Sequence, residues 1–442
     1  MTRRKYFGAL SGSLATAGAA AGIAEAQETP AAKPDSAALD LASFGIKADG
    51  ATDDTSAIQK ALDAAGKTGA TVVLPAARYL VAGSLKIPPG VGLEGIHNAV
   101  VGQGPLTGTV ILTTAGRDKE DAPALFDMGS GTMVRGLMIF YPEQVATDVH
   151  PYPWTFHLQG VDNTVENVTI VNTYNGIRVG PEVNGRHRLR SVVGCALRRG
   201  VLVDNTHEIG RVENVHWHCD FWASRGVNGN RPAVYEYMWK NLEAFTFART
   251  DWEYVTNTFV FPVKTGYRFI KTASGACNGQ FLGIGADAAQ RCVSVEQIQN
   301  MGLLITNGEF VCIPGERIQV VIEPTCTGSV RLVNCAFWGP SRQCVAMHGQ
   351  GYLSLSDSYV EISGRMPPGE PDQISLVEAD SGKIQVRGCT LRSRGKEPNI
   401  VLKKGLKHAI ISENNGPNGV SVVNEIGDQA IIVNNEPHTP AA

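Results

Sequence analysis

Short apolar runs, rich in Val and Ile, recur along the chain and are closed by Asn, Asp or Gly. The clearest are Leu303–Asn307, Val330–Asn334, Leu353–Asp357 and Ile384–Gly388. Their closing residues stand 27, 23 and 31 positions apart, and those of two similar strings, Asn172 and Gly194, stand 22 apart. Such a period, with turn residues that tolerate a left-handed backbone, is typical of a solenoid of stacked coils. The pattern predicts one elongated all-β domain, and the preference for Val and Ile disfavours a leucine-rich repeat.

One segment near the N-terminus has helical spacing instead. Its apolar positions recur three or four residues apart, at Ala57, Ile58, Ala61, Leu62 and Ala65. Asp53, Asp54 and Thr55 stand just before this stripe, and such side chains supply N-cap oxygens and favourable charge at the positive end of a helix. We therefore expect a capping helix followed by short strands, with these carboxylates as caps rather than catalysts.

The segment from 42 to 97 resembles the N-terminal region of the pectate-lyase superfamily. The resemblance rests on the phrase Phe44-Gly45-Ile46-Lys47-Ala48-Asp49-Gly50, followed by Thr52-Asp53-Asp54-Thr55. The later turn, Pro75-Ala76-Ala77-Arg78-Tyr79, keeps Pro and Tyr but has Ala77 where that superfamily has Gly. The resemblance implies a single-stranded right-handed parallel β-helix, here over residues 41–438. Since lyases, hydrolases, epimerases and phage adhesins share this fold, it implies no single chemistry.

The catalytic strings of the superfamily's pectin-hydrolysing branch do not occur in this sequence. The Asp-Asp pair is found only as Asp53-Asp54 in the expected helix cap, and Arg317-Ile318 is followed by Gln319 rather than Lys. No catalytic residue can therefore be carried over from that branch.

The first 26 residues have the composition of an export signal. Arg3 and Arg4 precede a weakly apolar Gly/Ala-rich stretch from 8 to 23, and Ala24-Glu25-Ala26 is a small-x-small cleavage site. The apolar run is too short and its side chains are too small for a membrane span. The sequence predicts a twin-arginine-type export signal over 1–26, a Pro/Ala-rich tether over 27–40, no membrane span, and a periplasmic or secreted location.

Composition narrows the classes of partner and cofactor. The 442 residues include 39 Lys and Arg against 42 Asp and Glu, a net charge of −3, so the basic surface that nucleic acid requires is not expected. The 9 Cys lack C-x-x-C spacing, which disfavours a zinc site and a full disulfide framework. We expect most of them to be small buried apolar side chains. Neither a metal nor another cofactor is predicted, and the oligomeric state is left open.

Residues 217–269 interrupt the regular repeat with a high density of aromatic side chains. They hold 14 of the 31 Phe, Trp and Tyr residues of the chain. Two interpretations fit: a thicker core where an insertion folds over the coils, or a platform on which sugar rings stack. On the second, Trp222, Trp252 and Tyr254 are expected to line sugar subsites.

Four acidic residues share a position relative to neighbouring apolar residues. Asp251, Asp287 and Glu309 each stand six residues after an apolar strand residue. Asp220 precedes an aromatic residue, as Asp251 and Glu309 also do. Aligned coils would place the four in a column, ~5 Å apart from one coil to the next. Carboxylates this close cannot all stay ionised, so one becomes a protonated acid beside an ionised base. This predicts glycosidase chemistry with Asp251 and Asp287 as the pair and Glu309 as the substitute.

Arg186, Arg249 and Arg291 lie near these acids in the sequence and are expected to bind an acidic substrate group. The favoured function is an exported enzyme that hydrolyses glycosidic bonds of a polysaccharide or oligosaccharide. One alternative is a polysaccharide lyase in which Arg or Lys abstracts a proton and the acids hold calcium. The other is a non-catalytic glycan-binding or adhesin-like solenoid. Sugar, linkage, exo or endo action, and retaining or inverting stereochemistry are left open.

Overall fold

The computed structural model describes residues 41–97, 103–313, 318–364, 374–393 and 395–439. Leu39–Ala442 forms one compact unit. The export signal and tether predicted for residues 1–40 lie outside the described residues.

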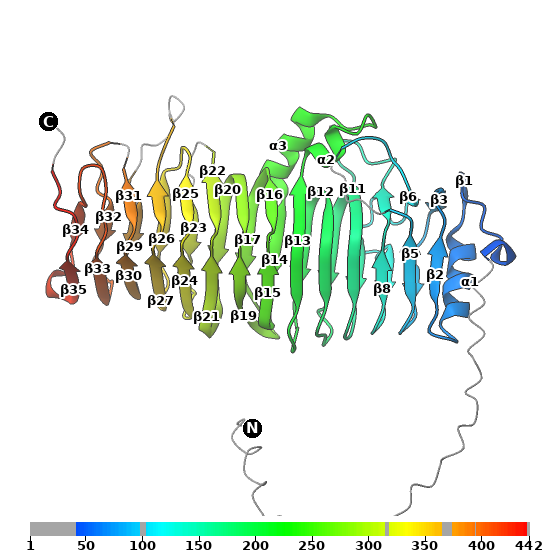
Figure 1. Cartoon of the computed structure of the whole chain (residues 1–442), viewed down its shortest axis with the longest axis horizontal. Coiled ribbons are helices and arrows are strands. Elements are labelled where there is room, and N and C mark those ends of the chain that lie inside the picture. Colours follow the sequence, from blue (N-terminus) through cyan, green and yellow to red (C-terminus); the bar gives the residue numbers. More distant parts are fainter. Residues whose placement is uncertain (1–40, 98–102, 314–317, 365–373, 394, 440–442) are drawn as a thin grey trace, which may run out of the picture. The chain divides into compact units, whose positions relative to one another are not determined.

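The chain from β1 onward winds as a parallel β-helix, which confirms the predicted fold (Figure 1). A regular coil gives one strand to each of three parallel sheets, here called sheets 1, 2 and 3, and the strands of inner coils pair with strands of the coils before and after. Strands β11, β12, β13 and β20 are long enough to turn a corner and enter more than one sheet. One short strand, β18 (Lys271–Thr272), pairs antiparallel with β19.

Sheet 1 contains β2 (Thr71–Leu74), β5 (Gly92–Gly95), β8 (Met133–Arg135), the first parts of β11 (Thr164–Val179), β12 (Arg188–Val203) and β13 (Arg211–His218), β15 (Thr250–Thr256), β19 (Gly275–Leu282), β21 (Ile298–Thr306), β24 (Ser329–Val333), β27 (Tyr352–Ser356), β30 (Lys383–Arg387), β33 (His408–Ser412) and β35 (Ala430–Val433). Sheet 2 contains β1 (Asp49–Asp53), β3 (Arg78–Val81), β6 (Val110–Thr113), β9 (Met138–Phe140), the middle of β11 and β12, the end of β13, β16 (Phe259–Phe261), the start of β20 (Gly285–Val295), β22 (Glu309–Cys312), β25 (Ala336–Trp338), β28 (Tyr359–Glu361) and β31 (Thr390–Arg392). Sheet 3 contains β4 (Leu85–Ile87), β7 (Phe126–Met128), β10 (Trp154–Leu158), the ends of β11, β12 and β20, β14 (Glu243–Phe247), β17 (Val263–Phe269), β23 (Ile318–Ile322), β26 (Gln343–Met347), β29 (Val377–Ala379), β32 (Ile400–Leu402) and β34 (Val422–Asn424).

Helices occupy the ends and one insertion of the solenoid. The described helices are η2 (Leu41–Phe44), α1 (Thr55–Ala65), α2 (Asp220–Ala223), α3 (Arg231–Asn241) and η3 (Gly427–Gln429). Helix α1 buries the predicted apolar stripe against the first coils, as expected of a capping helix. The expected side-chain cap is wrong for Asp54, because its carboxylate accepts hydrogen bonds from the backbone N–H groups of Lys47 and Ala48 instead.

The core is a stack of inward side chains from successive coils. Aromatic rings of neighbouring coils lie face to face, as for Phe245 and Tyr267, whose centroids are 4.9 Å apart at an interplanar angle of 7°. Phe310 and Phe337 of sheet 2 are also in contact, with centroids 5.4 Å apart and an interplanar angle of 41°. All 9 cysteines are buried and free of disulfide bonds, so the prediction that most of them serve as apolar core residues is confirmed.

The corner between sheets 1 and 2 explains the Asn, Asp and Gly residues that close the repeated strings. Asn307, Asn334, Asp357 and Gly388 have φ values of 57°, 50°, 52° and 65°. These residue types adopt the left-handed region at low cost, so the corner can turn sharply in every coil. Asn172 is different, because it is buried and its side chain bonds the backbone N–H and C=O of Tyr141.

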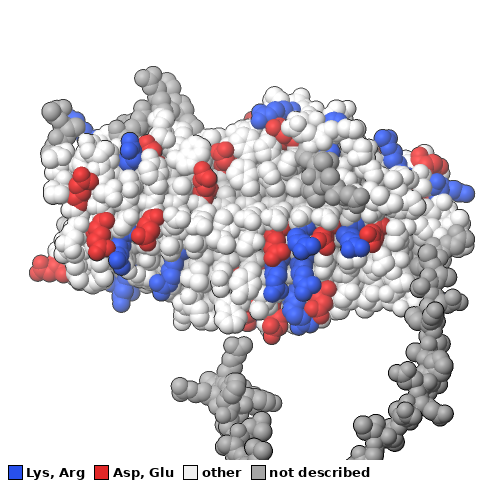
Figure 2. Space-filling model, viewed as in Figure 1, with Lys and Arg blue, Asp and Glu red and all other residues white. Residues whose placement is uncertain are grey.

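Charged side chains gather on sheet 1 over strands β8 to β13 (Figure 2). Acids and bases pair across neighbouring coils there, Arg135 with Glu94 at 2.8 Å and Arg190 with Glu166. Exposed pairs of this kind contribute little to stability. Because the charges largely neutralise one another, this surface does not present a strong field of one sign.

Candidate active site

An insertion between β13 and β14 departs from the regular coil. It contains α2 and α3, and it replaces the turn that leads from sheet 2 to sheet 3. Helix α2 lies against β11, β12 and β13, and α3 lies against β12, β17 and β20. Both helices are seen above these strands in Figure 1. The aromatic-rich region predicted over 217–269 is thus a helical insertion followed by ordinary coils from β14 onward.

The core interpretation of the aromatic residues is confirmed for part of the set, and the sugar platform stays a prediction. Six of them are fully buried in the core: Trp217, Trp222, Phe245, Phe247, Tyr267 and Phe269. Others lie partly exposed around two histidines, His216 and His218. His216 lies 5.0 Å from Phe259, and His218 stacks on Phe261 at 4.9 Å. Tyr235 of α3 packs edge-on against Phe261 at 5.6 Å.

Sheet 2 carries an open groove that starts at this aromatic cluster and runs across the coils from β16 to β31. Two hollows of about 400 and 370 Å³ adjoin along it and share Asn307 and Glu309. The first is lined by Asn257, Thr258, Phe259, Gly283, Ile284, Gly285, Ala286, Asp287, Asn307, Glu309, Val311 and Trp338. The second is lined by Asn307, Gly308, Glu309, Asn334, Cys335, Ala336, Asp357, Ser358, Tyr359, Gly388 and Thr390. We call this surface the sheet-2 groove; its volume is in the range of ligand sites.

Asp287 and Glu309 lie together in the first hollow. Glu309 pairs with Gly285 of the preceding coil, and Asp287 stands two residues beyond Gly285. Strand spacing and rise then place the two Cα atoms ~8 Å apart. Burial and the charge of Glu309 raise the pKa of Asp287, although the Ala288 N–H donates to its Oδ1 at 2.5 Å. Glu309 is exposed and accepts a hydrogen bond from Trp338 Nε1 at 3.0 Å. The hollow therefore holds two carboxyls, that of Asp287 with a raised pKa and that of Glu309, which is exposed.

The predicted column of four acids is wrong, because the four come from different parts of the coil. Asp251 lies at the corner between sheets 3 and 1, where Arg249 Nη2 binds its Oδ2 at 2.8 Å. Burial alone would raise the pKa of Asp251, but the hydrogen bonds from Arg249 and Gln299 lower it. Asp220 lies in α2 and is bound by Arg231 Nε at 2.8 Å. The acid pair in one hollow is therefore Asp287 with Glu309, not Asp287 with Asp251.

The predicted sugar-binding aromatics do not line the sheet-2 groove. Trp222 is fully buried and donates its Nε1–H to Asn228 Oδ1 at 3.1 Å, so it has no surface to offer a sugar. Trp252 is 54% exposed, but it lies at the turn into sheet 1. Tyr254 lies in sheet 1 under the guanidinium of Arg211, 5.9 Å from the ring centroid. The error follows from the helical insertion, which turns Trp222 inward.

The three predicted arginines each hold a structural ion pair. Arg186 binds both carboxylate oxygens of Asp162 at 2.7 Å, and Arg249 binds Asp251 as described above. Arg291 lies in sheet 3 beside Glu323, with a separation of 3.3 Å. The structure therefore brings none of the three into the described lining of the sheet-2 groove.

The histidines next to the groove have lowered basicity. Burial lowers the pKa of His216 to about 4, and burial also lowers the pKa of His218. The His216 Nε2 atom is buried without a hydrogen-bond partner among the described residues. Both rings are therefore neutral near pH 7. Their partners Phe259 and Phe261 come from the next coil, on the far side of the insertion, so no local sequence motif could indicate them.

One group of side chains in the described part of the chain could hold a metal ion. His218, Cys219 and Asp220 bring nitrogen, sulfur and oxygen donors within 4.8 Å of one another. His218 Nδ1 already accepts the Asp220 N–H at 3.0 Å, and burial raises the pKa of the Cys219 thiol to about 12. Calcium takes oxygen ligands, so the calcium expected of a lyase gains no support from this group and stays a prediction.

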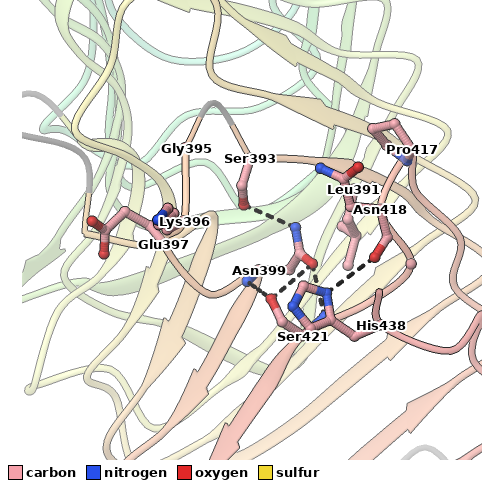
Figure 3. A pocket seen from close by; sticks show the side chains of 11 residues that line it. Leu391, Ser393, Gly395, Lys396, Glu397, Asn399, Pro417, Asn418, Ser421 and His438 are labelled. Carbon is pink, nitrogen blue, oxygen red and sulfur yellow. Dashed lines mark hydrogen bonds between the residues drawn. The ribbon is translucent and has the colours of Figure 1, made fainter. Parts of the chain in front are cut away.

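A third hollow, of about 400 Å³, lies at the C-terminal end of the coils (Figure 3). Its polar groups largely bond to one another: Asn399 Oδ1 accepts the Ser421 N–H at 2.9 Å, and His438 Nδ1 lies 3.0 Å from the Asn418 carbonyl. Glu397 is the one carboxyl in its described lining. The described lining of this hollow therefore lacks the second carboxyl that a glycosidase needs.

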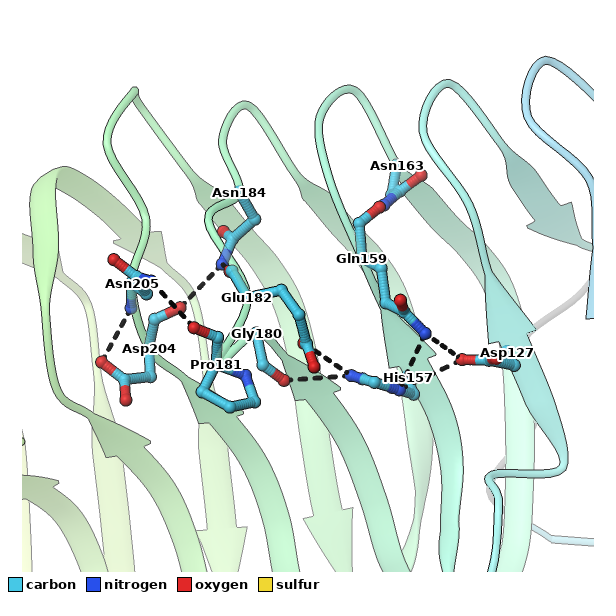
Figure 4. Close-up of polar contacts among 10 residues, drawn as sticks. All are labelled: Asp127, His157, Gln159, Asn163, Gly180, Pro181, Glu182, Asn184, Asp204 and Asn205. Carbon is cyan, nitrogen blue, oxygen red and sulfur yellow. Dashed lines mark hydrogen bonds and ion pairs between the residues drawn. The ribbon is translucent and has the colours of Figure 1, made fainter. Parts of the chain in front are cut away.

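A titratable cluster on sheet 3 has the character of a structural network (Figure 4). His157 lies between Asp127 Oδ1 at 3.1 Å and Glu182 Oε2 at 3.2 Å. Burial alone would lower the pKa of His157, but the hydrogen bond with Asp127 raises it, and the same bond lowers the pKa of Asp127. Gln159 adds a further hydrogen bond to Asp127. Because these charges satisfy one another, the cluster stabilises the coil rather than offering a reactive group.

No helix in the described part of the chain is long and apolar enough to cross a membrane. Residues 39–120 match the family model described as rhamnogalacturonase A/epimerase, pectate lyase-like. Alginate lyase 7 of Azotobacter vinelandii is 44% identical over 78 residues, which are 17% of this chain and 9% of that protein. The chain thus spans less than a tenth of that relative's length.

Two solved structures share the architecture at low identity. The A-module of mannuronan C-5 epimerase AlgE4 from Azotobacter vinelandii superposes with a TM-score of 0.53 at 15% identity, over 91% of this chain and 99% of that one. The Dettilon tailspike protein gives 0.50 at 12% identity, over 86% and 67%. Likeness at these identities shows the fold alone. The N-terminal match agrees with the resemblance of residues 42–97 to the pectate-lyase superfamily, and the coil architecture is the right-handed parallel β-helix that the resemblance implied.

Proposed function

We propose that the protein is an exported carbohydrate-active enzyme that hydrolyses glycosidic bonds, with Asp287 as general acid and Glu309 as general base. The observation that carries the proposal is the pair of carboxyls in one open hollow, one of them with a raised pKa. A glycosidase needs a carboxylic acid and a carboxylate on either side of the scissile bond.

The reaction follows from these two side chains. Asp287 gives its proton to the glycosidic oxygen as the bond from that oxygen to the anomeric carbon breaks. Glu309 takes a proton from the water whose oxygen attacks the same carbon, and solvent then restores both carboxyls. Because water attacks the anomeric carbon directly as the leaving group departs, we expect inversion at that carbon. Trp338, whose Nε1–H binds Glu309, orients the base.

The groove itself supports a polymeric substrate. It spans several coils, and Phe259, Trp338 and Tyr359 offer ring faces along it. Aromatic faces stack on the apolar faces of sugar rings while nearby polar groups bind hydroxyls. Further support comes from the names of the matched proteins, an alginate lyase and a mannuronan epimerase. An extracellular or periplasmic polymer fits the export signal predicted for residues 1–26.

The test is a panel of purified glycans incubated with the full chain and assayed for new reducing ends. We expect cleavage of at least one polymer, and Asp287→Asn and Glu309→Gln each to lower kcat ~10²-fold or more. Asp251→Asn is the matched control, because that acid is held by Arg249 away from the groove. Full activity in both groove variants together with loss in the control would refute the assignment.

A second candidate is β-elimination on a uronate polymer, which the names of the matched alginate lyase and mannuronan epimerase favour. The base expected from the sequence is Arg or Lys, since His218 Nδ1 already accepts the Asp220 N–H and the other nitrogen of the neutral ring carries the proton. The products differ, since elimination leaves a C=C bond that absorbs in the ultraviolet and hydrolysis does not. Unsaturated products that persist in Asp287→Asn would favour the lyase. Glycan binding without any new chain ends would favour the non-catalytic solenoid.

A further inference from the structure

We infer that the sheet-2 groove is closed at its β13 end by the insertion of residues 219–242, and that it takes the end of a glycan chain rather than its interior. The expectation of exo cleavage rests on the proposed function. The expectation that a chain end binds in the groove rests on the shape of the groove alone.

The outer face of sheet 2 is covered on the N-terminal side of the insertion. Met138 and Thr169 occupy the outward positions of β9 and β11 that align with His216 of β13, and both are fully buried. His97 Nε2 lies 3.2 Å from Thr169 Oγ1, so a preceding loop lies on this face. Arg225, which follows α2, is 4% exposed and donates to the Gly104 carbonyl at 3.3 Å. A glycan therefore cannot continue along sheet 2 past β13.

The insertion is fixed in place by its own hydrogen bonds. Asn228 Nδ2 donates to the carbonyls of Pro142 and Gln144 at 3.0 and 2.8 Å, while its Oδ1 accepts from the buried Trp222. Arg231 of α3 binds Asp220 of α2 at 2.8 Å, which ties the two helices together. Because Asn228 bonds to backbone groups and to the buried Trp222, we describe the insertion as a fixed wall rather than a movable lid.

The acid pair lies near the closed end. A single strand, β16, separates β13 from β20, so His218 and Asp287 are ~10 Å apart along the axis of the coils. Tyr235 narrows this space further, because it packs on Phe261 and lies close enough to Asp287 for burial and that carboxylate to raise the pKa of the phenol. On the other side, β25, β28 and β31 extend the groove ~15 Å beyond Glu309.

This asymmetry sets the size of the product. The short side of the groove, between the insertion and the scissile bond, holds the last sugar units of the chain. The long open side holds the rest of the chain. Tyr235 is then the residue that determines how many sugar units fit between the wall and the bond that breaks. The open side carries Tyr359, 39% exposed, as a more distant stacking surface.

The cleavage test compares product lengths with viscosity on a cleaved polymer. The wild type should release one short product of uniform length from the earliest times while the viscosity of the polymer falls little. Tyr235→Ala should shift that product to a longer one. Tyr352→Ala is the matched control, because Tyr352 lies in sheet 1 beside Arg331, and it should leave product length unchanged. Mixed lengths with a rapid fall in viscosity, or an unchanged product in Tyr235→Ala, would overturn the inference.

The binding test separates this inference from the proposed function. The same glycan is prepared at two chain lengths, and the binding capacity of each for the Asp287→Asn, Glu309→Gln double variant is measured per mass of glycan. A closed groove predicts that doubling the chain length halves the capacity, because it halves the number of ends. Equal capacity per mass, or no binding by any glycan of the panel, refutes the closed groove. A halved capacity with no cleavage by the wild type would keep the closed groove and refute the hydrolase.

Discussion

The role of Asp287 as a general acid can be isolated by changing the leaving group of the substrate. Asp287→Asn removes the transferable proton but keeps the Oδ1 atom that accepts the Ala288 N–H. A positioned acid contributes ~10²- to 10⁴-fold to the rate, which corresponds to ~2.7 to 5.5 kcal/mol of barrier. That loss should appear on a natural polymer, whose departing alkoxide needs a proton. An aryl glycoside whose phenolate leaves unprotonated should lose far less.

Glu309→Gln gives the contrasting pattern. It removes the base that activates water, and every substrate needs that step, so both the polymer and the aryl glycoside should be slowed alike. In the wild type, the raised pKa of Asp287 keeps the acid protonated toward higher pH. Polymer cleavage should therefore decline as the pH rises through that pKa, and aryl glycoside cleavage should not show this decline. The measurement is kcat against pH for two substrates and three proteins.

Stability measurements show whether a variant has lost activity because it misfolds. Asp287→Asn keeps the oxygen that accepts the Ala288 N–H, and the Glu309→Gln side chain keeps an oxygen for Trp338 Nε1–H. Neither substitution adds an unpaired charge, so the melting temperature of each variant should be close to that of the wild type. Equal losses of Asp287→Asn on both substrates, in a variant that melts normally, would refute its role as the acid.

Three further predictions concern the support of the site and the fold. Trp338→Phe keeps a ring in the groove but removes the Nε1–H bond to Glu309; kcat on the polymer should fall ~10-fold with little change in KM, and an unchanged kcat would exclude an orienting role. Phe310→Ala leaves a cavity beside Phe337 in the core beneath Glu309. Urea unfolding should show a free energy of unfolding lower by ~3 to 5 kcal/mol, and a change near zero would contradict the packing. Asp127 has a lowered pKa, so its contribution to stability is present above pH ~4 and is lost as the pH falls. His157 has a raised pKa, so its contribution is present below pH ~6.5 and is lost as the pH rises through the folded-state pKa. Asp127→Asn should therefore lower the melting temperature most between pH ~4 and ~6.5, and a uniform loss at every pH would contradict the ion pair.

The fold could be predicted because its information is local. A corner residue such as Asn334 must tolerate a left-handed backbone whatever its neighbours in space, so the residue type records the turn directly. The burial of the cysteines could be predicted in the same way, since a small apolar side chain within a Val-rich run belongs in the core of a coil.

The acid column failed because the same local pattern occurs at different corners. The run from Phe245 to Asp251 leads from sheet 3 into sheet 1, whereas the run from Phe281 to Asp287 leads from sheet 1 into sheet 2. Even between Asp287 and Glu309 the coils are offset by two residues, because Gly285 rather than Asp287 pairs with Glu309. Counting from an apolar residue cannot reveal which corner is being turned. Register depends on pairing with other coils, and that information is not local.

The placement of Asp287 has a structural cause that joins the fold to the chemistry. The pairing of β20 with β22 is irregular between Ala286 and Ala289, and Ala288 adopts φ 50°, a conformation that costs a residue with a Cβ atom ~1 to 2 kcal/mol. This bulge turns the Ala288 N–H onto the Asp287 carboxyl and ends the straight run of sheet 2 at that point. The packed coils on both sides hold the strained Ala288 in place. Among the packed side chains are Cys292 and Cys312, which are buried with their Sγ atoms 3.8 Å apart. The bulge thus fixes the hydrogen bond that Asp287 accepts, whereas burial and the charge of Glu309 raise the pKa of this carboxyl. A positioned carboxyl with a raised pKa is what a general acid requires.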